Sequence, residues 1–269
     1  MTLEKDYLKI CQEATSLVIE VGRYVREEFG KVGAIEIETK SRNSLVSYVD
    51  KGAERMLVRG LSAIVPDSVF LTEEDTIASK PGACRWIIDP LDGTTNFLHG
   101  LPVFSISVAF EVEGEVLIGI VFDVMREECF YGVKGNGAYL NGHRIKVSDT
   151  LYMEDALIAT GFPYIDYSRL DSYMQVLIAI MKKARGIRRL GSAAIDLAYV
   201  ACGRFDGFFE YSLNPWDVAA GLLLVEEAGG KISSFGGEEA DAFRGEEVVA
   251  SSETLYAAFF ELINQAFYP

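Results

Sequence analysis

The segment of residues 86–97, which reads WIIDPLDGTTNF, constrains this chain more than any other. It places Asp89 and Asp92 after an apolar strand and before a Gly-Thr-Thr turn. Pro90 restricts the backbone of both itself and Asp89, so that the two carboxylates can turn toward one point. Gly93 permits a tight bend, and the free N–H groups after it can hold an anion. The segment predicts a metal site beside a phosphate cradle, although a turn followed by a helix that Thr94 caps would give the same pattern.

Two further segments contain acids in positions that suit such a site. Residues 69–75, VFLTEED, form a short apolar strand that ends in Glu73 and two more acids. Residues 214–221, NPWDVAAG, read as a helix start with proline at the first position and Asp217 in the first turn. Taken alone, the first segment reads equally well as a solvated acidic loop. Asp217 alone reads as a carboxylate that the helix dipole favours.

The spacing of apolar residues predicts two halves with different patterns. Residues 1–147 are expected to form an α+β half with two amphipathic helices and an antiparallel sheet, and residues 148–269 an α/β half with a mixed sheet. The expected elements of the first half are helices at 4–29 and 50–64, strands at 35–38, 46–49, 69–71 and 86–88, and a meander at 104–145. Those of the second half are strands at 156–160, 186–190, 206–210, 230–233 and 248–250, and helices at 168–184, 192–203, 215–228 and 252–266.

Composition limits the partners and the compartment. The net charge of −15 argues against a nucleic acid as the main partner, because phosphate contacts need clustered Lys and Arg. No apolar run reaches the roughly 18 residues of a membrane span. The charged N-terminus does not read as a signal peptide, and the four cysteines contain no C-x-x-C pair. We therefore expect a cytoplasmic protein with reduced thiols and no membrane partner.

The charge also bears on the cofactor. A pocket that contains Glu73, Asp89, Asp92 and Asp217 would repel a phosphate ester unless bound cations reversed the local charge. Carboxylates are hard oxygen ligands, and the chain has only two histidines, His99 and His143. Mg²⁺ is therefore favoured over Zn²⁺, with Mn²⁺ as a possible substitute.

The three acidic segments, in this order, resemble the inositol monophosphatase family of metal-dependent, lithium-sensitive phosphatases. The resemblance extends over the whole chain, including residues 45–50 and 191–194. It implies an α+β fold with alternating layers, α-β-α-β-α, and an active site between the two halves. It also implies a homodimer, which the general prevalence of two-fold symmetry favours as well.

The resemblance implies a metal site for two or three Mg²⁺ ions. Asp89 would bridge two of them. Glu73 and the backbone carbonyl of Leu91 would complete the first position, and Asp92 and Asp217 the second. Glu73 would also support a third, more hydrated ion. Ser44 stands where family members commonly have Asp, so the third ion is expected to bind more weakly here, while Lys40 aligns less securely.

The resemblance also implies roles around the metals. Thr94 and Asp50 would activate the attacking water, so that the catalytic residues are Asp50, Glu73 and Thr94. The backbone of Gly93 and Thr94 would hold the phosphate, with Thr95 supporting the turn. The positions that would bind the alcohol are Gly191, Ser192, Ala193 and Glu210. The residues allow plainer readings as well: Asp50 and Ser192 as helix caps, and Glu210 as a surface carboxylate at a strand end.

The expected activity is hydrolysis of a small polyol phosphate, with myo-inositol 1-phosphate as the best single substrate. Fructose 1,6-bisphosphate, 3′-phosphoadenosine 5′-phosphate, histidinol phosphate or NADP(H) are alternatives. Lys182, Lys183, Arg185, Arg188 and Arg189 could supply a second phosphate site at the rim. A regulatory protein with incidental catalysis is a third alternative.

Overall fold

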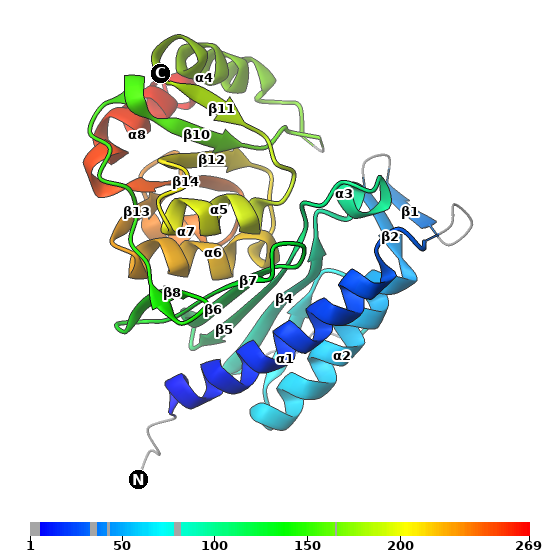
Figure 1. Ribbon diagram of the computed structural model, residues 1–269. Helices are drawn as coiled ribbons and strands as arrows, with labels where there is room; N and C mark the ends of the chain where they lie inside the picture. The colour runs from blue at the N-terminus through cyan, green and yellow to red at the C-terminus, as the bar shows by residue number, and fades with distance from the viewer. Residues whose placement is uncertain (1–5, 33–36, 42–43, 78–81, 165) are drawn as a thin grey trace.

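The chain folds into five layers of helix and sheet (Figure 1). The computed structural model describes residues 6–32, 37–41, 44–77, 82–164 and 166–269, and the side chains of 37–41 and 44–46 lie outside the described part. Helices α1 (Tyr7–Glu28) and α2 (Tyr48–Ile64) form one outer layer, and α4 (Leu170–Lys183) and α8 (Glu253–Phe267) form the other. Helices α5 (Ala193–Ala201) and α6 (Pro215–Glu227) lie between the two sheets. The α+β sandwich predicted from the sequence is confirmed.

The first sheet follows chain order from β3 to β9 and contains the predicted antiparallel meander. Only its first pair, β3 and β4, is parallel among the described strands. Its buried residues, such as Trp86 and Phe110, pack against the apolar faces of α1 and α2. The strands are β3 (Val69–Thr72), β4 (Cys84–Asp92), β5 (Ser105–Val112), β6 (Glu115–Asp123), β7 (Glu128–Val133), β8 (Gly137–Leu140) and β9 (His143–Arg144). A separate hairpin consists of β1 (Ile37–Ser41) and β2 (Ser44–Ser47).

The second sheet is mixed, as the alternation of strands and helices predicted. Its order is β11-β10-β12-β14-β13, in which β10 is parallel to both neighbours and β14 is antiparallel to both of its own. The strands are β10 (Leu157–Thr160), β11 (Gly186–Arg188), β12 (Gly207–Tyr211), β13 (Gly230–Ser233) and β14 (Glu247–Ser252).

Several boundaries differ from the sequence prediction for local reasons. Strand β4 does not end at Ile88 but continues through Asp92, because Asp89 pairs with Ser107 and Asp92 with Ser105 across an irregular register. The short helix α7 (Glu239–Ala242) was not predicted. The plainer reading of residues 93–97 offered a helix capped by Thr94, and a short helix α3 (Thr94–Leu98) is present, but its N-cap is Gly93. Residues 35 and 36 of the predicted strand 35–38 lie outside the described residues.

The two sheets share one core. Helices α5 and α6 pack between them, so that Ile87 and Phe130 of the first sheet belong to the same apolar cluster as Phe208 and Val248 of the second. The division of the chain at residue 147 therefore stays a prediction. In the described part of the chain, no helix is both long and apolar enough to cross a membrane.

Candidate active site

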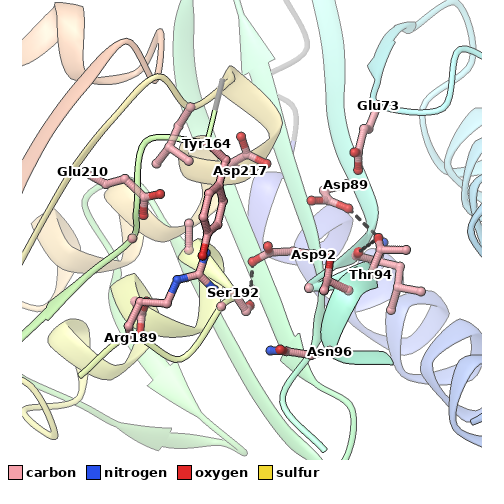
Figure 2. Close-up of a pocket in the computed structure, with 18 residues that line it drawn as sticks. Glu73, Asp89, Asp92, Thr94, Asn96, Tyr164, Arg189, Ser192, Glu210 and Asp217 are labelled. Carbon is pink, nitrogen blue, oxygen red and sulfur yellow. Dashed lines mark hydrogen bonds between the residues drawn. The ribbon is translucent and has the colours of Figure 1, made fainter. Parts of the chain in front are cut away.

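A cleft of about 530 Å³ opens where the two sheets and the middle helices meet. Asp89 and Asp92 reach it from β4 and Asp217 from the first turn of α6, and their carboxylate oxygens lie within 4.8 Å of one another. Glu73, which follows β3, points toward Asp89 (Figure 2). The described lining residues are Glu73, Asp89, Leu91, Asp92, Gly93, Thr94, Thr95, Asn96, Gly161, Tyr164, Arg189, Gly191, Ser192, Ala193, Asp196, Glu210, Leu213 and Asp217.

Backbone and hydroxyl donors fix the three clustered aspartates. Leu91 N–H donates to Asp89 Oδ1 at 2.8 Å. Ser192 Oγ donates to Asp92 Oδ2 at 2.6 Å, and Ala194 N–H donates to the same oxygen at 2.8 Å. Asn214 N–H donates to Asp217 Oδ2 at 2.7 Å as part of a capping box. One oxygen of each aspartate is thus anchored.

Ser192 is more deeply engaged than the sequence suggested. It is the N-cap of α5 and accepts from Ile195 N–H, so the cap considered as its plainer reading is present. Its hydroxyl also donates to Asp92 and lies 3.0 Å from Ser105 Oγ. Ser192 therefore lines the cleft mainly as a support for Asp92, while Gly191 and Ala193 beside it also line the cleft.

Thr94 and Asp50 are in direct contact although 44 residues separate them in the chain. Thr94 Oγ1 lies 3.0 Å from Asp50 Oδ1 and 2.9 Å from the Leu91 carbonyl oxygen, and its one hydrogen can be donated to either. Asp50 is not the helix cap that the sequence allowed. The N-cap of α2 is Ser47, whose N–H and Oγ both donate to Asp50 Oδ2. Burial raises the pKa of Asp50.

The turn after β4 has the backbone geometry on which the predicted phosphate cradle depends, and the cradle itself stays a prediction. Gly93 has φ 98°, a left-handed conformation that favours glycine, and a Cβ there would lie 3.0 Å from the Val103 carbonyl oxygen. Helix α3 begins at Thr94, so the N–H groups of Thr94 and Thr95 lie in a first turn, where helices leave N–H groups without intrahelical partners.

The carboxylates are crowded, and their close packing raises the pKa values of several of them. Burial, followed by the charges of Glu73, Asp92 and Asp217, raises the pKa of Asp89 well above its ordinary value. Burial also raises the pKa of Asp92 to about 6 and that of Asp217 to about 7. Neither His99 nor His143 is among the described residues that line the cleft. An all-oxygen donor set of this kind fits Mg²⁺.

Glu210 lies inside the cleft, so its reading as a surface carboxylate is wrong. It is only 9% exposed, and burial raises its pKa to about 8. Its position depends on Gly161, because a Cβ at residue 161 would lie 1.9 Å from Glu210 Oε1.

The acidic segment after β3 is held by a residue that the sequence did not single out. Glu54 of α2 is fully buried and accepts hydrogen bonds from Glu74 N–H at 2.8 Å and from Thr76 N–H at 2.7 Å. The segment is therefore anchored at its base and not a freely solvated loop. The side chains of Lys40 and Ser44, which bear on the third metal position, lie outside the described part.

Sequence reasoning also missed Asn96, Asp196 and Tyr164. Asn96 Nδ2 donates to the carbonyls of Val103 and Leu190, which joins α3 to the loop before α5. Asp196 is 1% exposed, and its Oδ1 has no hydrogen-bond partner in the described structure. Asp196 lies one helical turn after Ser192, and this spacing was the available signal that both would face one cleft.

Comparisons with known proteins agree with this arrangement. A family model described as the inositol monophosphatase family matches residues 6–267. Inositol-1-monophosphatase of Rhizobium meliloti is 42% identical over 251 residues, which cover 92% of this chain and 93% of that protein. The putative Nus factor SuhB of Neisseria meningitidis serogroup B is 41% identical over 244 residues, 90% of this chain and 93% of that protein. The crystal structure of extragenic suppressor protein suhB from Bartonella henselae matches with a TM-score of 0.88 and 38% identity, covering 93% of this chain and 96% of that one.

The layered fold and the acidic cleft place the protein in a class of phosphatases. More narrowly, the chain belongs to the inositol monophosphatase family.

Proposed function

We propose that the protein is a Mg²⁺-dependent hydrolase of small polyol phosphate monoesters and that myo-inositol 1-phosphate is the first substrate to test. The observation that carries the proposal is the cluster of Asp89, Asp92 and Asp217 beside the hydrogen-bonded pair Thr94 and Asp50. The names of two relatives, both called inositol-1-monophosphatase, support the choice of substrate.

In this proposal the clustered carboxylates hold the ions. Asp89, Asp92 and Asp217, with Glu73 and the Leu91 carbonyl, would bind two or three Mg²⁺. When bound, the ions would neutralise phosphate charge and make a water molecule easier to deprotonate. Thr94 Oγ1 would orient that water and donate its own hydrogen to Asp50 Oδ1. The N–H groups of Gly93, Thr94 and Thr95 would hold the phosphate, and Glu210 would accept a hydrogen bond from the leaving alcohol.

The test is release of phosphate from myo-inositol 1-phosphate by purified protein. We expect activity with Mg²⁺, weaker or altered activity with Mn²⁺, and loss of activity after chelation that Mg²⁺ reverses. Inhibition by Li⁺ is expected from the family resemblance. Undiminished activity in metal-free protein would refute the proposal. A panel that contains fructose 1,6-bisphosphate, 3′-phosphoadenosine 5′-phosphate, histidinol phosphate and NADP(H) tests the alternative substrates.

A second candidate function is a regulatory one, because relatives with 40–41% identity are named Nus factor SuhB or putative Nus factor SuhB. An inactive variant separates the two. If the Asp217→Asn protein no longer hydrolyses the substrate but its gene still substitutes for the wild-type gene in cells, the role that the cells need is regulatory. If it fails to do so while it still folds, catalysis is the role. The expectation that no nucleic acid is a partner stays a prediction.

We also propose a cytoplasmic homodimer. The four cysteines are free, which suits a reducing compartment. Helix α4 exposes Met174, Ile178 and Met181, with exposed fractions of 41%, 45% and 68%, along one face. Such an apolar stripe is typical of a surface that packs against a second copy. Sedimentation should show a dimer, and Ile178→Glu with Met181→Glu should yield monomer. A monomeric wild type would refute this part.

A further inference from the structure

The charge balance of the cleft is uneven. Six acidic side chains line it, from Glu73, Asp89, Asp92, Asp196, Glu210 and Asp217. Among the described lining residues, Arg189 is the single one with a cationic side chain. The proposed hydrolysis gives this lone guanidinium no role when the alcohol part of the substrate is an uncharged polyol.

Arg189 is held in place without using its hydrogen-bond donors. Its guanidinium carbon lies 5.1 Å from the centre of the Tyr164 ring and 5.5 Å from that of Phe162. It also fits against Gly191, where a Cβ would lie 2.6 Å from Arg189 Nη1. Within the described residues, no hydrogen bond or ion pair of this guanidinium is found. Stacking therefore orients the group and leaves its donors available to a ligand.

The other cations of this region are directed elsewhere. Arg188 donates to the Ile187 carbonyl and lines a separate hollow with Arg126 and Arg204. Arg185 pairs with Asp155 on the surface, and it shares with Arg189 a second hollow beside α4 but does not line the cleft. Lys183 lines a hollow between α4 and α8, and Lys182 is exposed. Of the basic cluster at residues 182–189, only Arg189 lines the cleft among the described residues.

The position of Arg189 assigns it to the side of the leaving alcohol. Figure 2 shows Arg189 on the same side of the cleft as Ser192 and Glu210, away from Glu73, Asp89 and Thr94. Its charge counteracts the effect of burial on the pKa of Asp92, Asp196 and Glu210, so the guanidinium lies within electrostatic reach of all three. Thr94, which the proposed function assigns to orienting the attacking water, lies on the opposite side.

We propose that Arg189 is a specificity residue that binds a second anionic group, a phosphate or a carboxylate, on the leaving alcohol of the substrate. A guanidinium offers paired donors that match the oxygens of either group. In the proposed function Glu210 accepts a hydrogen bond from the alcohol nearby, so the substrate class is a small polyol phosphate with a second anion. This inference rests on the proposed function and narrows it.

Two pairs of substrates test the proposal. In each pair one member carries a second anion where the other carries a free hydroxyl or hydroxymethyl group. Fructose 1,6-bisphosphate against fructose 1-phosphate tests a phosphate, and glycerate 2-phosphate against glycerol 2-phosphate tests a carboxylate. The variants are Arg189→Gln, Arg189→Lys and, as the matched control, Arg188→Gln. The control removes the same charge from the adjacent residue, which faces away from the cleft.

The expected result is a loss of about tenfold to a hundredfold in kcat/KM for Arg189→Gln on the doubly anionic member of at least one pair. The loss on its partner should be several times smaller. Arg189→Lys should recover part of the activity, and Arg188→Gln should behave as wild type. The pair that shows the effect identifies the anion. Equal losses on both members would overturn the proposal, because Arg189 would then act on the reacting phosphate, and so would no loss on either.

Binding separates this proposal from the proposed function. Calorimetric titration of wild type and Arg189→Gln with fructose 1,6-bisphosphate and with glycerate 2-phosphate needs no turnover. If wild type hydrolyses none of the esters but binds one of these ligands more tightly than the variant does, the proposed function fails and the anion site stands. Equal affinities of wild type and variant for both ligands would remove Arg189 from recognition.

Discussion

Each of the three clustered aspartates carries a structural hydrogen bond as well as its proposed metal contact. Asp89 accepts from Leu91 N–H, Asp92 from Ser192 and Ala194, and Asp217 from Asn214 N–H. An asparagine in these positions keeps an accepting oxygen and nearly the same shape. Substitution by Asn therefore separates charge from packing, whereas Ala would remove both.

Asp217→Asn should lower kcat by orders of magnitude, because one Mg²⁺ position loses an anionic ligand. The cost in stability should be on the order of 1 kcal/mol or less, since the capping oxygen is kept. Phosphate release and thermal unfolding measure the two effects. Asp171→Asn is the matched control, because Asp171 is also a first-turn acid, on α4 away from the cleft. A variant within twofold of wild-type kcat would take Asp217 out of the metal site.

Glu210→Gln should affect substrates unequally. If Glu210 accepts hydrogen bonds from polyol hydroxyls, the change weakens that contact and lowers kcat/KM for inositol 1-phosphate by about tenfold to a hundredfold. An aryl phosphate without hydroxyls should be much less affected. Gly161→Ala should give the same pattern, because its Cβ would occupy the space of the Glu210 carboxylate. Equal losses on both substrates would instead assign Glu210 to catalysis.

Among the elements, the short segment after β3 depends most on its neighbour. Glu54 on α2 is fully buried and receives Glu74 N–H and Thr76 N–H, and this anchors the backbone next to Glu73. Helix α2 also carries Asp50, so one helix supports both the acidic segment and the pair that we propose to activate the water. A change at Glu54 should therefore alter the proposed metal site through the backbone next to Glu73, although Glu54 is not itself a proposed ligand.

Glu54→Gln should raise the Mg²⁺ concentration needed for half-maximal activity, because the Glu73 side chain loses its fixed position. The neutral Gln side chain also forms weaker hydrogen bonds with the N–H groups of Glu74 and Thr76, which should lower the free energy of unfolding by about 1–3 kcal/mol. Magnesium titration of activity and chemical denaturation measure the two effects. Glu13→Gln, an exposed change on α1, should leave both as in wild type. An unchanged magnesium requirement would contradict the proposed link from Glu54 to Glu73.

The elements could be predicted from the sequence where apolar periodicity and turn residues agree. Helix α6 and the meander of β5 to β9 followed from such signals. The extension of β4 through Asp92 did not, because the apolar run ends at Ile88 and only the pairing with Ser107 and Ser105 continues the strand. Similarly, the N-cap of α2 is Ser47, and Asp50 is its capping-box partner three residues later. The sequence alone did not decide this, because either a serine or an aspartate can be the N-cap.

For the whole molecule, the acidic motifs could be found from the residues themselves, whereas Glu210 followed only from the family resemblance and Gly161 was not found. Asp89 and Asp92 share one short motif, whereas Gly161, Arg189 and Glu210 meet only because β10, the loop after β11, and β12 end at one cleft. Arg188 and Arg189 are adjacent in sequence and identical in type, and only the tertiary structure separates the one that lines the cleft from the one that does not.

The convergence of both halves on one acidic cleft makes the stability of the metal-free protein depend on pH. Burial raises the pKa of Asp92 to about 6, of Asp217 to about 7 and of Glu210 to about 8 in the folded state. Unfolded carboxyl groups titrate near 4, so ionisation favours the unfolded chain above that pH. The folded state is therefore penalised least near pH 4 to 5, and the penalty grows until the pH passes about 8.

The melting temperature of metal-free protein should consequently fall as the pH rises from 5 to 8. Saturating Mg²⁺ should remove most of this slope, because bound cations favour the ionised forms of Asp92 and Asp217. Glu210 is not a proposed ligand, so its share of the slope should persist with Mg²⁺ and disappear in Glu210→Gln. Calorimetric melting of wild type and of Glu210→Gln, each with Mg²⁺ and with chelator, measures these effects. A metal-free melting temperature that rises over this range would show that ionisation of Asp92, Asp217 and Glu210 does not penalise the folded state. A slope that Mg²⁺ does not change would mean that no cation binds among these carboxylates.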